Sequence, residues 1–420
     1  MPEYAKYEGW KDGENNILRS TELSPTQLRR CVNFDITDTG ELQVRQGRSI
    51  VYNGSIQPRS FFSNGTRALF VESGHLWELY KKQDGTYDRI LVRLNVGARA
   101  MTHLDVNGDI YWSNGVNTGI FTTEGEDLAW GIRSPHEQPT VIGATSGGRL
   151  TAGVYQVAMT FVSDRGEESG TPLAKEITLP EGTETGSIVV QNIPLSTEAD
   201  TVRIYVSHPN GEGLYRAGEF YTGTPQFRIT RVDNAVDIRL QTQFGIKPPA
   251  GDVLEYHNGR IYIAQGNVVW FTDPLRYGLV RPHTNFLMYP SEVTVMKAVA
   301  DGIFICADKT YWVTNIDTSD FQQREVLPYG AVYGTGIDIP ESDNVAWFSH
   351  DGMVIAGLEA QVSNIQEDRS AVSKFNVGAM MYRKSGGLRQ IVATLGGGTQ
   401  SAYLSRDYAA LETARRGDAI

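Results

Sequence analysis

The chain repeats one short pattern of apolar and polar positions. A turn of Asn, Asp or Gly precedes about five apolar or aromatic residues, and a second polar turn leads into another apolar stretch. Short apolar runs between turn residues are typical of β-strands joined as hairpins. The pattern begins at positions 65, 107, 258, 301, 343 and, most weakly, 386.

The spacing of these repeats indicates the fold. Four of the five intervals are 42 or 43 residues, and the interval from 107 to 258 is 151. If residues 135–248 are an insertion, removing its 114 residues shortens that interval to 37. A repeat of about 40–45 residues with paired hairpins is what a four-stranded propeller blade needs. We therefore expect an all-β fold, a β-propeller of about six blades formed by residues 41–134 and 249–404.

The insertion has its own pattern. Prolines stand at both of its ends, and strand-like segments alternate with Gly, Asn and Asp turns inside it. About 100 residues with a turn every 8–12 residues are typical of a small β-sandwich. The expected strands are Gly153–Val162, Ser187–Gln191, Thr201–Val206 and Gln226–Thr230.

Both ends of the chain lack the repeat, so we expect residues 1–40 to form an N-terminal arm and residues 405–420 a C-terminal tail. Ser24 is a possible N-cap with Pro25 at the first helical position, which predicts a short helix to Arg30. A second short helix is expected within 408–416.

The propeller also needs a closing strand. An open stack of blades would leave two unpaired sheet edges, which invite aggregation. We expect Glu41–Asn53 to supply a strand that pairs with the last blade near Gly386–Leu404.

Composition narrows the possible functions. The chain has 44 Gly, 20 Tyr, 15 Phe and 7 Trp, as expected for many short strands and tight turns. Its net charge of −11 argues against a general nucleic-acid or anionic-membrane binder. No stretch approaches the ~20 apolar residues of a membrane span, and the N-terminus lacks an apolar signal core. Cys31 and Cys306 are expected to be free thiols.

The sequence carries no recognisable catalytic motif, so we expect no enzyme activity, no cofactor and no metal. The glycines at 396–398 lack the Lys of a phosphate-binding loop, and the seven histidines are scattered. The Asp164–Glu168 segment could offer oxygen ligands to calcium but lacks the full loop, so we interpret it as a turn.

Two other function classes stay open. A glycoside hydrolase needs two facing carboxyls, for which the candidates are Asp105, Asp252, Asp301 and Asp343. A lectin or receptor-binding tail protein would contact host glycans through exposed aromatic rings. We expect the repeated aromatic residues to pack between blades instead, namely Tyr111, Trp112, Trp270, Trp312 and Trp347.

The N-terminal segment carries a longer motif. It contains Asn15-Asn16-Ile17, Leu23 and Leu28-Arg29-Arg30, then Val32-Asn33, Asp35-Ile36, Gly40-Glu41-Leu42 and Arg45-Gln46-Gly47. This motif resembles the opening of the tail hub or nozzle proteins of short-tailed bacteriophages, also called packaged-DNA stabilisation proteins. Cys31 and Gln46 depart from the usual pattern.

The resemblance implies a structural virion protein with repeated hairpins and a fibronectin-like insertion. Such a protein is made in the host cytoplasm and forms a homo-oligomeric ring, a hexamer, below the portal and adaptor. The ring retains packaged DNA and conducts it during ejection without sequence-specific binding. A tail fibre or plug protein is a further possible partner. An acidic channel wall would repel phosphates, which agrees with the net charge.

The two terminal arms are the expected contacts with neighbouring proteins, because they lie outside the repeats. The candidate interface residues are Leu28, Arg29, Arg30, Arg415 and Arg416. The two arginines at 29 and 30 could instead cap the carbonyls of the expected helix.

Overall fold

A computed structural model describes residues 9–45, 47, 49–54, 58–232, 238–316, 320–367, 369, 375–385 and 388–396. The chain divides into two compact units, which we describe separately. The central unit comprises residues 56–81 and 88–288, and the terminal unit comprises residues 1–55, 82–87 and 289–420. The described residues are almost entirely strands and turns, so the expected all-β class is confirmed.

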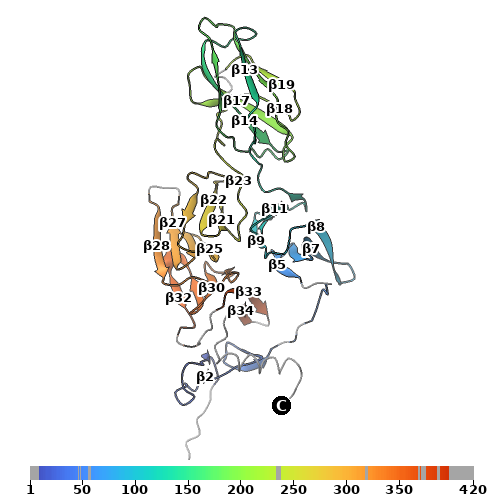
Figure 1. The fold of residues 1–420 in the computed structure, drawn as a ribbon. Coiled ribbons are helices and arrows are strands. Elements are labelled where there is room, and N and C mark those ends of the chain that lie inside the picture. Colours follow the sequence, from blue (N-terminus) through green and yellow to red (C-terminus); the bar gives the residue numbers. More distant parts are fainter. Residues whose placement is uncertain are drawn as a thin grey trace, which may run out of the picture. The chain divides into compact units, whose positions relative to one another are not determined.

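Three sheets of the central unit follow the repeat, and the first four strands of each are neighbours in the order of the sequence (Figure 1). The first holds β5 (Arg59–Ser63), β6 (Ala68–Glu72), β7 (His75–Lys81) and β8 (Tyr87–Arg93). The second holds β9 (Thr102–Val106), β10 (Asp109–Ser113), β11 (Thr118–Phe121) and β12 (Asp127–Leu128). The third holds β20 (Val253–His257), β21 (Arg260–Gln265), β22 (Val268–Asp273) and β23 (Arg276–Val280), with β24 (Phe286–Met288) paired to β22.

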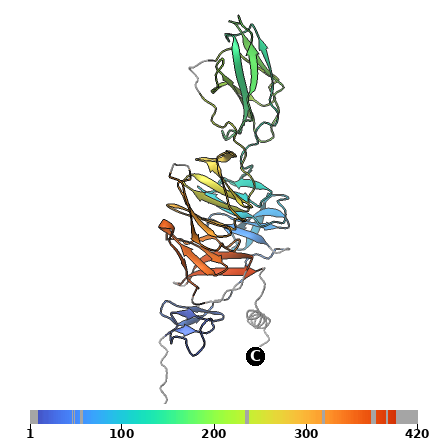
Figure 2. The same ribbon diagram turned by 60° about the vertical axis from the view of Figure 1, so that its left-hand side comes forward.

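Residues 140–229 form two further sheets of the central unit, whose long strands are drawn in green in Figure 2. One sheet has the order β13-β16-β19, from Thr140–Ala144, Ser187–Gln191 and Gln226–Ile229. The other has the order β15-β14-β17-β18, from Lys175–Leu179, Gly153–Val162, Thr201–Ser207 and Leu214–Tyr221. A shared core that includes Val157, Ile188 and Ile204 joins the two sheets. The four strands expected here are confirmed.

The terminal unit contains two more sequential four-stranded sheets and a hairpin. The first sheet is β25 (Val295–Val299), β26 (Gly302–Cys306), β27 (Thr310–Thr314) and β28 (Gln322–Leu327). The second is β29 (Ile337–Asp338), β30 (Val345–Ser349), β31 (Gly352–Ala356) and β32 (Val362–Asn364), with a short 3-10 helix at Leu358–Ala360. The hairpin is β33 (Val377–Ser385) and β34 (Leu388–Gly396).

Successive four-stranded sheets of one unit pack through apolar side chains. Trp112 is fully buried in a cluster with Leu69 and Leu76 of the preceding sheet. In the terminal unit, Trp312 and Trp347 share a cluster, and both rings pack against Phe304. The expected interior position of the repeated aromatic residues is therefore confirmed, except that Trp270 is only partly buried against Phe286.

The opening segment differs from its expected form. Gln27–Leu28 is a two-residue strand, β2, that pairs in parallel with Gly13–Glu14, β1, so the expected helix from Ser24 to Arg30 is wrong. The Gln27 backbone N–H donates to the Ser24 carbonyl, which closes a turn. Seven residues form too few helical hydrogen bonds to compete with this pairing. The tail expected at 405–420, with its helix, lies outside the described residues.

The expected closing strand is also wrong. Leu42–Val44, β4, pairs antiparallel with Phe34–Ile36, β3, and no described residue of 41–53 pairs with β33 or β34. Gly40 stands in the turn between β3 and β4 at φ +85°, a conformation that glycine adopts without strain. A hairpin this short closes at a small entropic cost, which favours the local pairing.

Candidate functional site

The phage-like motif of the opening segment builds a folded structure from polar contacts. Asn15 is buried, and its Oδ1 accepts hydrogen bonds from the Ile17 and Leu18 backbone N–H groups, both at 3.1 Å. The Asn16 N–H donates to the Arg369 carbonyl at 3.0 Å. Two motif residues therefore satisfy backbone groups that turns leave unpaired.

Asp35 is a motif residue that connects this segment to β33. Its carboxylate is buried and pairs with Arg45 at 2.9 Å and with Arg383 of β33 at 3.3 Å. Burial on its own would raise the pKa of Asp35, but hydrogen bonds from Arg45 and Gln390 and the charges of both arginines lower it overall. Side chains, rather than a shared sheet, thus link the opening hairpin to β33 and β34.

The candidate interface residues lie on and after β2. Leu28 is partly buried and stands opposite Glu14 in the parallel pair. Arg29 is partly exposed, and its Nη1 donates to the Leu18 carbonyl, while Arg30 is exposed. Arg29 therefore contacts a carbonyl of a turn and not of a helix. Arg415 and Arg416 lie outside the described residues.

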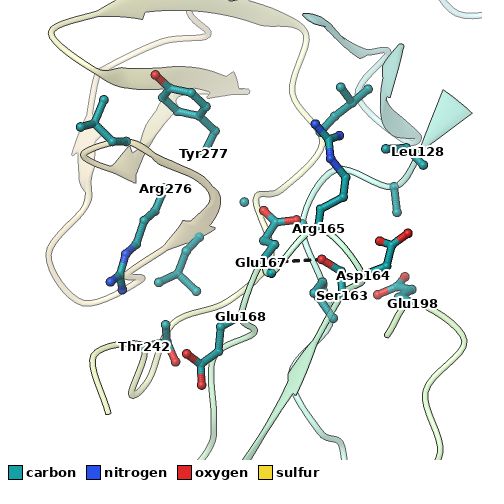
Figure 3. Close-up of a pocket in the computed structure, with 18 of the residues that line it drawn as sticks. Leu128, Ser163, Asp164, Arg165, Glu167, Glu168, Glu198, Thr242, Arg276 and Tyr277 are labelled. Atoms are coloured by element: carbon teal, nitrogen blue, oxygen red, sulfur yellow. Dashed lines mark hydrogen bonds between the residues drawn. The ribbon is translucent and has the colours of Figure 1, made fainter. Parts of the chain in front are cut away.

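The central unit also holds a pocket of about 530 Å³ (Figure 3), which we call the junction pocket. Three segments supply most of its lining: residues 128–132 after β11, the turn at 163–168 between β14 and β15, and residues 275–279, which are Leu275 and the first four residues of β23. The sequence predicts the turn from Asp164-Arg165-Gly166, and the Ser163 carbonyl accepts a hydrogen bond from the Gly166 N–H at 3.0 Å. The pocket lies where the 140–229 sheets join the repeat sheets.

Glu167 is a partly buried carboxylate of this turn. Burial raises its pKa, and the charges of Arg165 and Lys247 act in the opposite direction. Its Oε1 lies against the backbone of Gly278, where an added Cβ would stand only 1.5 Å away. The absence of a side chain at 278 is what lets the turn and β23 approach.

Two further carboxylates of the pocket, Glu168 and Glu198, are each held by several partners. Glu168 accepts hydrogen bonds from Thr160 Oγ1 and Tyr205 Oη, both at 2.6 Å, and pairs with Arg203 at 3.1 Å. Glu198 accepts a hydrogen bond from the Arg133 backbone N–H at 2.8 Å and pairs with Lys247 at 3.6 Å. These contacts stabilise the junction and leave little capacity for chemistry.

Two tyrosines, Tyr111 and Tyr277, also line the pocket, and Trp130 packs behind them. Trp130 is fully buried and donates from Nε1 to the Tyr277 carbonyl at 2.7 Å. Tyr111 packs edge-on against Trp130 and Tyr277, with ring centroids 5.3 and 5.9 Å away. Burial raises the pKa of Tyr111 far above its ordinary value, so this hydroxyl stays protonated.

The carboxyls considered for glycoside hydrolysis lie in four different segments, Asp105 in β9 and the other three outside the strands. Asp105 accepts a hydrogen bond from the Gly108 N–H at 3.0 Å, and Asp252 pairs with Arg99 at 3.2 Å. Asp301 accepts from the Glu359 N–H at 2.7 Å, and Asp343 is exposed. Within the described ranges, no group of three His, Cys, Asp or Glu side chains could hold a metal ion, and no helix is long and apolar enough to cross a membrane.

Comparisons with known proteins give little guidance. No protein-family model matches the chain, and no curated protein matches it. A protein from Lactobacillus plantarum is 9% identical with a TM-score of 0.35, covering 81% of this chain and 92% of that one. The WD40 β-propeller domain of Doa1 is 9% identical with a TM-score of 0.28, covering 84% and 96%. Scores this low carry no argument about fold or function, so the description of the fold rests on the strand pairing alone.

Proposed function

We propose that this chain is a structural protein of a short-tailed phage tail. It is a β-propeller of about six blades with an inserted fibronectin-like sandwich at 135–248. Copies of it form a ring, a hexamer, below the portal and adaptor, and this ring retains packaged DNA and conducts it during ejection.

The opening segment is the observation that carries this proposal. The residues that resemble the phage motif are also those that hold the segment together, as Asn15, Asp35 and Gly40 illustrate. A chance match of sequence letters would have no reason to coincide with buried polar contacts. The sequential four-stranded sheets, packed through buried tryptophans, support the propeller part of the proposal.

The ring is tested by electron microscopy of the purified full chain. Two-dimensional class averages are expected to contain closed rings with an axial hole wide enough for a DNA duplex. Single particles without a hole, at concentrations that fill the grid, would contradict the proposal. A hydrolase assay on polysaccharide substrates is expected to give no product, and turnover would favour the enzyme alternative.

The proposed contact with the adaptor is tested by charge reversal in the opening segment. The Arg29→Glu/Arg30→Glu variant is expected to form rings that no longer join the head-to-tail connector. Arg389→Glu, an exposed arginine of β34, is the matched control and is expected to join it normally. Normal attachment of the double variant would remove these two residues from the interface.

A further inference from the structure

A second hollow of the central unit, about 570 Å³, lies beside the junction pocket and has a different chemistry. We call it the arginine groove. It is lined by Arg239, Leu240, Gln241, Gln243, Phe244, Asp273, Pro274, Arg276 and Arg281. Figure 3 shows the Arg276 guanidinium extending away from the Tyr277 ring, as expected for adjacent residues of a strand.

The positive charge of this groove is not balanced by its own lining. Asp273 is the single carboxylate among the lining residues, and Arg281 Nε already contacts both of its oxygens at 2.8 and 3.1 Å. Asn285 donates a further hydrogen bond to Asp273 at 2.9 Å. Asp273 and Arg281 therefore neutralise each other, and the charges of Arg239 and Arg276 are left without a carboxylate in the lining.

Neither of these two guanidiniums forms an ion pair with a described residue, although Arg276 also lines the junction pocket, where Glu167 and Glu168 lie. Arg276 donates from Nη2 to the side-chain carbonyl of Gln241, an uncharged acceptor. Within the described part of the chain, the Arg239 guanidinium makes no hydrogen bond or ion pair. A chain of net charge −11 thus presents a local surplus of two positive charges in a hollow. Such a site attracts an anionic group, because guanidinium–carboxylate pairs are stronger than neutral hydrogen bonds.

An exposed aromatic ring completes the groove. Phe244 is 40% exposed although it is large and apolar, and its backbone has a φ of +62°. This conformation is strained for a residue with a bulky side chain, and such strain concentrates at functional sites. The Phe244 N–H donates to the Thr171 carbonyl at 3.0 Å, which holds the strained residue in place.

We propose that the arginine groove binds an acidic sugar, a carbohydrate unit that carries a carboxylate. Arg239 and Arg276 pair with the carboxylate, the Gln241 and Gln243 amides serve the hydroxyls, and Phe244 covers the apolar face of the sugar ring. A nucleic-acid strand is the less suitable ligand, because its charged backbone would run beyond the groove onto a surface of an acidic protein.

The test is calorimetric titration of the full chain with hexagalacturonate, using maltohexaose as a neutral sugar of the same length. Hexagalacturonate is expected to bind, and its affinity is expected to fall as salt is added. Maltohexaose is not expected to bind. Arg276→Gln and Arg239→Gln are each expected to weaken binding about tenfold, as typical for loss of one charged hydrogen-bond donor. Arg389→Gln changes the net charge equally at an exposed site outside the groove and is expected to bind normally.

Several outcomes would overturn this proposal. They are unchanged affinity in both groove variants, equal binding of maltohexaose, or tighter binding of an oligothymidylate than of hexagalacturonate. Arg239 is the informative position if Arg276→Gln alters the fold, because the Arg239 guanidinium makes no hydrogen bond or ion pair with the described residues. The inference goes beyond the proposed tail function, and the class averages of the same variants report ring formation separately, so each idea can fail alone.

Discussion

The junction pocket and the arginine groove share Arg276 in their linings, yet the charged groups around them are paired to different degrees. In the junction pocket, Glu168 and Glu198 each have cationic and hydrogen-bonding partners supplied by the protein itself. In the arginine groove, one carboxylate faces three guanidiniums. The first arrangement gives Glu168 and Glu198 partners within the protein, as a structural contact does, and the second leaves capacity for a ligand.

The difference offers a way to distinguish residues that stabilise the fold from residues that bind a ligand when the sequence carries no motif. Substitutions in the junction pocket should change stability and leave binding intact. Substitutions of the surplus arginines should change binding and leave stability nearly intact. The predictions below test this separation, beginning with the largest expected effect.

Gly131→Ala is expected to destabilise the central unit by about 2–4 kcal/mol. Gly131 has a φ of +75°, and an added Cβ would lie 2.6 Å from the Gly278 carbonyl oxygen and 2.8 Å from Pro248. The measurement is a urea titration followed by tryptophan fluorescence. Gly182→Ala, at φ +83° with no atom within 4 Å, is the control and should cost only the backbone strain of about 1–2 kcal/mol. Equal losses in the two variants would show that the junction is loosely packed.

Arg281→Gln should distinguish the paired arginine of the groove from the surplus ones. This variant leaves the buried Asp273 with Asn285 as its remaining described partner. We therefore expect the free energy of unfolding to fall by about 1–2 kcal/mol, a value that already allows for the partial exposure of Arg281. Arg239→Gln should change the free energy of unfolding by less than about 0.5 kcal/mol. The same urea titration measures both. A loss for Arg239→Gln as large as that for Arg281→Gln would contradict the surplus of charge.

Asp35→Asn is expected to loosen the opening segment, because Arg45 and Arg383 lose the charge that they share. Folded Asp35 has a lowered pKa, so its contribution to stability is present above its ordinary pKa and is lost as the pH falls through the lowered value. Hydrogen exchange of residues 27–44 should therefore be faster in the variant at pH 7, with a smaller difference at pH 3. Exchange that is equal at pH 7 would exclude this role for Asp35.

Glu167→Gln is expected to have the smallest effect, a slight stabilisation at neutral pH. Burial raises the pKa of Glu167, so the folded chain releases this proton at a higher pH than the unfolded chain, and the cost of the buried charge appears as the pH rises. Melting temperatures of the variant and the parent should differ more at pH 7 than at pH 4. A variant that is less stable at pH 7 would mean that Arg165 and Lys247 outweigh the burial.

The sequence predicted the middle strands of the repeat sheets better than the outer ones. The repeats coincide with middle strands such as β26 and β30, which are buried along their whole length and therefore appear as apolar runs. Outer strands such as β28 are largely exposed and have no apolar pattern to recognise. The same reason explains why β13, β15 and β18 were not expected.

Long-range contacts explain what the sequence missed. The opening segment was expected to be a helix because Ser24 and Pro25 are good local signals, but pairing with Gly13–Glu14 across the segment prevails. The arginine groove joins residues 239–244 to residues 273–281, and no local motif marks either segment. The strained backbone of Phe244 is likewise invisible until the structure is known.

The ring is the central claim, and the mass of the assembly tests it most directly. Sedimentation of the purified full chain should give a species of about six times the 46.4 kDa chain mass, stable on dilution. A single species at 46.4 kDa across the whole concentration range would contradict the account.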